Sequence, residues 1–135
     1  MEALVGIVIV SHSAQIAAGT VELARQMAGD ELRIEAAGGT ADGELGTDAS
    51  AIMTAITAAD TGAGVVVLVD LGSAVLATTT ALELLGEDVA ARVRLSGGPL
   101  VEGAVVAAVQ ASVGDDLAAV LAAAEEAASL PKIPE

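Results

Sequence analysis

The sequence predicts an α/β fold: an open, doubly wound, mostly parallel sheet of four to five strands in the order 2-1-3-4, with helices on both faces. Two observations predict it. Short aliphatic segments alternate with segments of helical apolar periodicity along the 135-residue chain. Repeated strand–helix units of this kind need parallel strands joined by right-handed crossovers. The length suits a single domain, which we place at residues 1–130, followed by a C-terminal tail at 131–135.

Four aliphatic segments predict the strands. They are residues 4–10 (LVGIVIV), 32–36 (LRIEA), 65–69 (VVVLV) and 93–95 (VRL). The first and third are continuously apolar, which is typical of strands covered on both faces. A glycine-rich loop over residues 37–46 follows the second strand.

Between the strands, apolar residues recur at helical spacing, and we expect them to face the sheet. Helix by helix, they are Ile16, Thr20, Leu23 and Met27; Ile52, Ala55, Ile56 and Ala59; Val75, Thr79, Leu82 and Leu85; and Leu117, Val120, Leu121 and Ala124. The helix boundaries are marked by capping residues, a proline at a first helical position and glycine stops. These boundary residues are Thr47 or Asp48, Asp115 or Asp116, Pro99, Gly29, Gly86 and Gly114.

The composition excludes several classes of function. The net charge of −14 disfavours nucleic acid and anionic membrane surfaces, and it favours a partner with a basic docking face, although the acid excess can also serve solubility alone. Without Cys and with a single His, thiolate and multi-histidine metal sites are excluded, so we expect no metal. No apolar run reaches the roughly 18 residues of a membrane span, and the N-terminus lacks a basic region, so we expect a cytoplasmic protein.

Small and hydroxyl residues follow every predicted strand. The four segments are SHS at residues 11–13, GTD at 46–48, DLGS at 70–73 and SGGP at 96–99. In doubly wound sheets, ligands bind at the carboxyl ends of the strands. Because backbone N–H groups at helix starts attract anions, a phosphate would fit at this edge.

His12 and Asp70 are the two side chains at this edge that suggest chemistry. His12 follows the first strand and Asp70 the third, and the order 2-1-3-4 makes these strands neighbours. A carboxylate that accepts from Nδ1–H would fix the tautomer and leave Nε2 as a nucleophile. Spacing alone leaves an alternative, in which backbone groups satisfy His12 and Asp70 caps a helix. Ser73 and Thr47 are likewise either phosphate ligands or ordinary helix caps.

Other chemistries lack their motifs. No G-x-x-x-x-G-K-[ST] supports a P-loop, and no G-x-S-x-G elbow supports a hydrolase. A receiver domain would place acids after the first strand and a lysine near the end of the sheet. Here the first strand ends in SHS, and the only lysine is Lys132 in the tail.

Five motifs in order give a more specific indication. They are VIVSHS (8–13), GTDA (46–49), DLGSA (70–74), TALELL (80–85) and PLVEG (99–103). Together they resemble the DhaM family, the phosphocarrier subunits of phosphoenolpyruvate-dependent dihydroxyacetone kinase, which are related to mannose-type IIA domains of the sugar phosphotransferase system. The resemblance covers about residues 4–128, and it implies a mannose-type IIA-like fold.

The resemblance implies that His12 is the phosphoacceptor. It would accept a phosphoryl group from the carrier HPr and pass it to ADP held on the DhaL subunit, whose ATP phosphorylates dihydroxyacetone on DhaK. An Asp at the position of Asp70 holds the active His in mannose-type relatives, and Gly72 and Ser73 match the segment that cradles the phosphoryl group. We add Thr47 and Ser13 as phosphoryl-binding candidates. The resemblance also implies a homodimer and no cofactor bound by this chain.

Two departures from related families matter. Mannose-type IIA domains carry a longer loop with an Asn after the Asp, whereas this chain has DLGSA, which favours the DhaM branch. Some DhaM proteins carry fused HPr-like and enzyme-I-like domains, and this sequence does not include them, so HPr would act as a separate protein. The alternatives are a mannose-type IIA domain of a sugar permease and a non-catalytic α/β binding module.

Overall fold

The computed structural model describes residues 3–134 and contains a four-stranded sheet whose strands are all parallel. The strands are β1 (Gly6–Ser11), β2 (Ile34–Gly38), β3 (Val65–Val69) and β4 (Val93–Ser96). Their order is β2-β1-β3-β4, which confirms the predicted topology. The second strand begins two residues later than predicted, so the glycine-rich loop begins later too.

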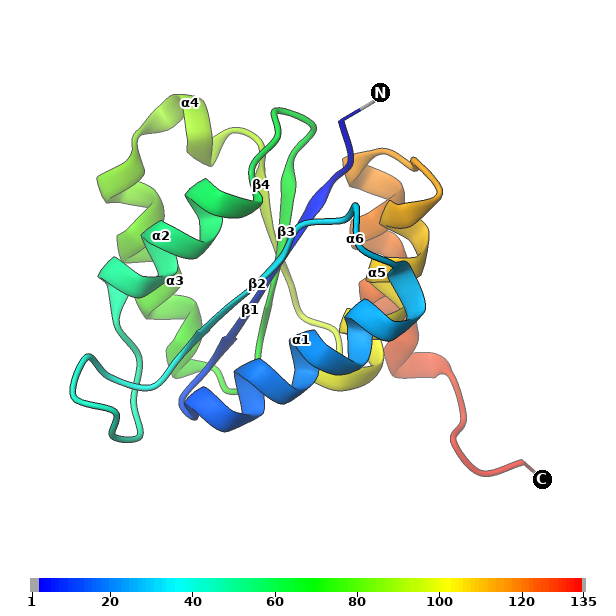
Figure 1. Ribbon diagram of the computed structural model, residues 1–135, viewed down its shortest axis with the longest axis horizontal. Helices are drawn as coiled ribbons and strands as arrows, with labels where there is room; N and C mark the ends of the chain where they lie inside the picture. Colours follow the sequence, from blue (N-terminus) through cyan, green and yellow to red (C-terminus); the bar gives the residue numbers. More distant parts are fainter. Residues whose placement is uncertain (1–2, 135) are drawn as a thin grey trace.

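Helices cover both faces of the sheet (Figure 1). The chain order gives α1 (Ala14–Ala28), α2 (Ala49–Ala59), α3 (Ser73–Leu85), α4 (Glu87–Ala90), α5 (Leu100–Ser112), α6 (Leu117–Glu126) and the 3-10 helix η1 (Ala127–Ser129). The first, fifth and sixth helices pack on one face, and the second and third on the other. The short α4 and η1 were not predicted. Within the described residues, none of the helices is both long and apolar enough to cross a bilayer.

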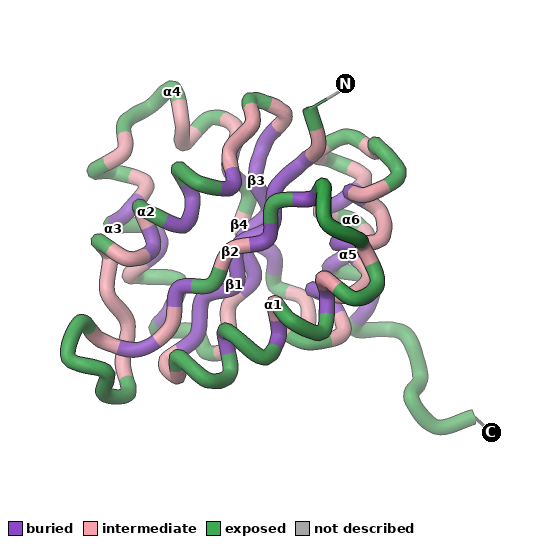
Figure 2. Tube along the Cα trace, in the orientation of Figure 1, coloured by how far each residue is buried: buried purple, intermediate pink, exposed green. Residues whose placement is uncertain are grey.

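Alternate residues of the central strands point into two separate cores. Ile7 and Ile9 of β1 join one cluster, while Val8 and Val10 join the other. This alternation follows from the two-residue period of a strand. All of β1 is buried, and so is β3 except for its last residue, Val69, which is partly buried (Figure 2). The buried strands therefore hold the residues that follow them at fixed positions on the carboxyl edge.

The predicted inner faces of α1 and α3 are largely wrong. The helix α1 buries Ala17, Thr20 and Ala24, and the other three predicted residues, Ile16, Leu23 and Met27, are exposed. The helix α3 buries Ala74, Thr78 and Ala81, whereas Val75 and Thr79 are exposed and Leu82 and Leu85 are only partly buried.

Close packing explains why small residues took these positions. A Cβ placed on Gly38 of β2 would lie 2.8 Å from the Ala17 Cβ, so the backbones of β2 and α1 are almost in contact. Interiors packed at this density leave no room for a larger side chain beneath the helix. The large aliphatic residues of α1 therefore lie on its outer side.

The predicted inner face of α2 is confirmed, because Ile52, Ala55, Ile56 and Ala59 are all buried. Asp48 rather than Thr47 caps this helix, and Asp116 rather than Asp115 caps α6, where Val120 and Ala124 are buried and Leu117 and Leu121 are partly buried. Pro99 is the residue before α5 and not its first helical residue.

Candidate functional site

The parallel pairing of β1 with β3 brings His12 and Asp70 together. The register places Val10 opposite Val69, and the Asp70 N–H donates to the Val10 carbonyl at 3.1 Å. One residue beyond each strand, His12 Nδ1 lies 3.0 Å from Asp70 Oδ1. The predicted contact across the strand ends is therefore present.

Asp70 accepts four hydrogen bonds. Oδ1 accepts from the His12 ring at 3.0 Å and from the Leu71 N–H at 2.7 Å. Oδ2 accepts from the Ser11 hydroxyl at 2.8 Å and from the His12 N–H at 2.9 Å. Burial acts to raise the pKa of Asp70, but these hydrogen bonds outweigh it and hold the pKa below its ordinary value. The group is therefore a carboxylate at neutral pH.

The ionised carboxylate determines the tautomer of His12. Because a carboxylate only accepts hydrogen bonds, the proton of a neutral imidazole must be on Nδ1. Nε2 then carries a lone pair, and the hydroxyl of Ser73 donates to it at 2.6 Å. The side chain of His12 is 25% exposed, so this nitrogen is accessible from the carboxyl edge of the sheet. The arrangement makes Nε2 a nucleophile.

Ser73 lies at the first helical position of α3, and Gly72 precedes it as the N-cap. No side chain caps this helix, so the alternative role of Ser73 as the capping residue does not apply. The first hydrogen bonds that lead into the helix are donated by Ala74 and Val75, to the carbonyls of Leu71 and Gly72. The N–H groups of Gly72 and Ser73 precede them and point, as at any helix start, toward an incoming acceptor. A Cβ at Gly72 would meet nothing within 4 Å, so the approach is open.

Ser13 and Thr47 have different surroundings from Ser73. The Ser13 hydroxyl accepts from the Ile16 N–H at 3.2 Å and thereby caps α1. Within residues 3–134, the side chain of Thr47 has no recorded hydrogen bond, although the neighbouring Gly46 N–H donates to the His12 carbonyl at 2.8 Å. Phosphoryl binding by these two residues stays a prediction.

Ser11 is a site residue that the sequence reasoning missed. It is fully buried, donates to Asp70 Oδ2 and accepts from the Ser13 N–H at 3.0 Å. It links the carboxylate to the first turn after β1. The available signal was a single hydroxyl residue at the end of an otherwise aliphatic strand.

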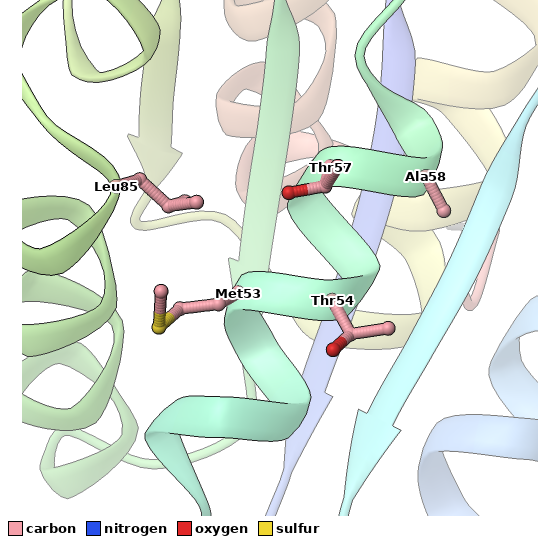
Figure 3. A pocket seen from close by; sticks show the side chains of 5 residues that line it. All are labelled: Met53, Thr54, Thr57, Ala58 and Leu85. Carbon is pink, nitrogen blue, oxygen red and sulfur yellow. The ribbon is translucent and has the colours of Figure 1, made fainter.

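The apolar groove between α2 and α3 offers no comparable chemistry. It has a volume of about 460 Å³ and is lined by Met53, Thr54, Thr57, Ala58 and Leu85 (Figure 3). None of these side chains titrates near neutral pH. The groove lies beside the helices, whereas His12 and Asp70 follow the strands.

An imidazole nitrogen that carries a lone pair beside helix-start N–H groups is able to accept a phosphoryl group. Residues 6–121 match the family described as EIIA-man, the PTS system fructose IIA component. The fold and this match define a IIA-type component of the phosphotransferase system.

The chain belongs, within that class, to the DhaM family. It is 41% identical over 118 residues to the phosphoryl donor subunit DhaM of PEP-dependent dihydroxyacetone kinase 2 of Listeria innocua, covering 87% of this chain and 94% of that protein. It is 46% identical over 117 residues to the Escherichia coli DhaM subunit, where the match covers 84% of this chain and only 25% of the relative. The chain thus spans about a quarter of the length of that relative.

Solved structures share the fold. A crystal structure of a protein of unknown function, EF1359, superposes with a TM-score of 0.81 at 42% identity, covering 91% of this chain and 94% of that one. The dihydroxyacetone kinase of C. freundii superposes with a TM-score of 0.60 at 19% identity, covering 96% of this chain and 26% of the kinase. The second similarity concerns the fold alone.

Proposed function

We propose that this chain is a phosphohistidine carrier that takes a phosphoryl group from HPr and passes it to ADP bound on a DhaL subunit. The observation that carries the proposal is the Nδ1–H of His12 held by Asp70, which leaves a lone pair on Nε2 at the open edge. The names of the relatives, phosphoryl donor subunits of a dihydroxyacetone kinase, support the same role.

Nδ1 of the ring keeps its proton in both transfer steps. Nε2 of His12 forms an N–P bond while the donor's N–P bond breaks, and the phosphorylated ring becomes imidazolium-like. Asp70 stabilises this charge through Oδ1. In the second step, a terminal phosphate oxygen of ADP forms the new O–P bond and Nε2 leaves with its electron pair. Such transfers depend on in-line positioning and charge stabilisation.

Ser73 changes partner during the first step. Its hydroxyl lies 2.6 Å from Nε2, so the incoming phosphoryl group must take the place of this hydrogen bond. The hydroxyl and the N–H groups of Gly72 and Ser73 then donate to phosphoryl oxygens. The ring is thus held in its attacking orientation before the partner arrives.

The remaining parts of the proposal concern the assembly. ATP formed on DhaL phosphorylates dihydroxyacetone on DhaK, and this chain works in the cytoplasm as a homodimer without a bound cofactor. The activity is that of a phosphotransferase subunit, since the chain carries the group and a partner holds the final substrate.

Phosphorylation by purified donors tests the proposal. The chain is incubated with phosphoenolpyruvate, enzyme I and HPr, and its intact mass is measured. We expect one added phosphoryl group that is lost in acid and stable in base, as for a phosphoramidate. His12→Ala is the control: it should fold, because the ring is partly exposed and its removal leaves the buried core untouched, and it should take up no phosphate. A labelled His12→Ala protein, or an acid-stable label, would contradict the site assignment. Addition of a DhaL subunit with ADP should then discharge the wild-type protein and form ATP.

A further inference from the structure

Ser11 is a buried hydroxyl residue that the proposed transfer steps do not use. It is the last residue of β1, and it is fully buried. Its oxygen accepts a hydrogen bond from the Ser13 N–H at 3.0 Å. Its single hydrogen is donated to Asp70 Oδ2 at 2.8 Å. The hydroxyl therefore has one partner on each side, and because the residue is buried, bulk water does not compete for either.

The orientation of the Asp70 carboxylate is not fixed by its own side chain. The terminal torsion of an aspartate is broad, so it does not hold the two oxygens at defined angles. Which oxygen faces the His12 ring therefore depends on the donors around the carboxylate. Oδ1 accepts from the ring and from the Leu71 N–H, and Oδ2 accepts from the His12 N–H and from the Ser11 hydroxyl.

Ser11 differs from the other donors in the part of the fold to which it belongs. The Leu71 N–H comes from the residue after Asp70, and the His12 N–H comes from the residue whose ring is held. The Ser11 hydroxyl extends from β1, a strand that is buried along its whole length and paired with β2 and β3. It thus ties the second oxygen of the carboxylate to the centre of the sheet.

The same hydroxyl also joins the carboxylate to the start of α1. Ser13, whose N–H donates to Ser11, caps this helix with its own side chain. A continuous series of hydrogen bonds therefore runs from the first turn of α1 through Ser11 and Asp70 to Nδ1 of His12. In such a series, each hydrogen bond polarises the next.

We infer that Ser11 is a positioning residue for phosphoryl transfer: its hydroxyl fixes the orientation of the Asp70 carboxylate and, through it, the tautomer and the direction of the His12 ring. The inference rests on the proposed function, because it adds a residue to the same site. Ser11 itself does not reach the phosphoryl group, since it lies beneath Asp70. Ring direction matters because in-line transfer tolerates little misplacement of the attacking atom.

Ser96 provides a matched control. It is the last residue of β4, is 2% exposed and accepts from the N–H of Gly98, two residues further on, at 3.0 Å, as Ser11 accepts from Ser13. In the described part of the chain, the Ser96 hydroxyl donates to no carboxylate, and β3 separates β4 from β1. Ser11→Ala and Ser96→Ala therefore remove the same local contact, and only the first also removes a donor to Asp70.

The test measures kcat and KM with phosphorylated HPr, the rate constant with phosphoramidate as a small phosphoryl donor, and the His12 tautomer by nitrogen NMR. A hydrogen bond to a charged group is worth about tenfold or more in an equilibrium, so we expect Ser11→Ala to slow transfer from both donors about tenfold and to raise the ratio of Nε2–H to Nδ1–H by a similar factor. KM for HPr should keep its wild-type value, because the buried hydroxyl touches no partner. Ser96→Ala should keep the wild-type rates and tautomer, while the melting temperatures of the two variants fall alike.

Ser11→Thr tests the hydroxyl itself. It keeps the donor and adds a methyl group at a buried position, so we expect a lower melting temperature but rates and a tautomer ratio close to those of the wild type. A residue that acts only through packing would give the opposite order, with Ser11→Ala better than Ser11→Thr. That order would overturn the inference, and so would equal effects of Ser11→Ala and Ser96→Ala on rate and tautomer, or a change confined to KM.

The wild-type protein supplies a measurement that does not depend on whether a variant folds. The Ser11 hydroxyl hydrogen is buried and donated to a carboxylate, so it should exchange slowly with water and give its own proton NMR signal. A hydroxyl in fast exchange would overturn the inference even where HPr phosphorylates the protein. If HPr did not phosphorylate the wild type, the proposed function would fail and the transfer role of Ser11 with it, so the two failures are distinguishable.

Discussion

Asp70→Asn removes the negative charge of the carboxylate and keeps its shape. The effect of this substitution on stability and on phosphate uptake can be worked out from the four hydrogen bonds that Asp70 accepts. An amide offers one oxygen and one NH2 in place of two accepting oxygens. Whichever way it turns, the NH2 faces one backbone N–H, either that of Leu71 or that of His12. One backbone donor therefore loses its partner.

The magnitude follows from these contacts. An unsatisfied donor at a partly buried site costs about 1–2 kcal/mol, so we expect that loss of folding stability. If the NH2 faces the ring, it donates to Nδ1 of His12 and moves the proton to Nε2, which then donates to Ser73 and has no lone pair for phosphorus. The same tautomer error in a serine-protease triad costs about 10⁴ in rate. We expect phosphate uptake to fall between about 10² and 10⁴-fold, since partner docking can limit the wild-type rate.

The assay uses the only imidazole of the chain. Nitrogen NMR reports which ring nitrogen of His12 carries the proton, and intact mass reports phosphate uptake from HPr and from phosphoramidate. Asp60→Asn is the matched control, because it also removes a hydrogen-bonded carboxylate but lies at the opposite edge of the sheet, where it pairs with Arg92. If Asp70→Asn kept the proton on Nδ1 and the wild-type uptake rate, Asp70 would not control the tautomer of His12.

Three further outcomes are expected. Ser73→Ala should slow phosphate uptake by roughly 10²-fold at most, because one hydrogen-bond donor is lost. The melting temperature should stay nearly unchanged, because the Ser73 side chain caps no helix; a large drop in melting temperature at an unchanged rate would contradict this prediction. Gly38→Ala should lower the free energy of unfolding, measured in urea, by about 1–3 kcal/mol, since its Cβ would lie 2.5 Å from the Ser13 carbonyl oxygen; a wild-type value would show that the start of α1 shifts at no cost. The hydrogen bond from Arg92 lowers the pKa of Asp60 below its usual 3.8, so this pair stabilises the fold fully above that pH and loses its contribution as the pH falls through the lowered pKa. Asp60→Asn and wild type should therefore differ in urea stability at pH 7, and the difference should shrink as the pH is lowered below 3.8; a constant difference would refute the assignment.

The sequence alone predicted the topology and the sheet edge at which His12 and Asp70 lie, while spacing left their direct contact open. The aliphatic runs at residues 65–69 and near the N-terminus could only be strands covered on both faces, and alternation with helices required them to be parallel. Parallel strands end at one edge, so His12 and Asp70 had to lie there. These conclusions depend on chain connectivity and periodicity, which are properties of the sequence itself.

Tertiary packing decided which side of α1 faces the sheet. Hydrophobicity favoured Ile16, Leu23 and Met27, but the backbone of β2 approaches too closely, and Ala17 and Ala24 were buried instead. A periodic pattern ranks side chains by transfer free energy and contains no information on the distance between two backbones.

Only the tertiary structure also decided whether Ser73 caps a helix or contacts His12 directly. Both roles suit a serine at a helix start, and only the position of the β1 end relative to α3 puts its hydroxyl on Nε2 of His12. The burial of Ser11 beneath Asp70 has the same origin, since its partner is 59 residues away along the chain. Local sequence fixes which groups can donate and accept, whereas their pairing depends on which strand ends the sheet places side by side.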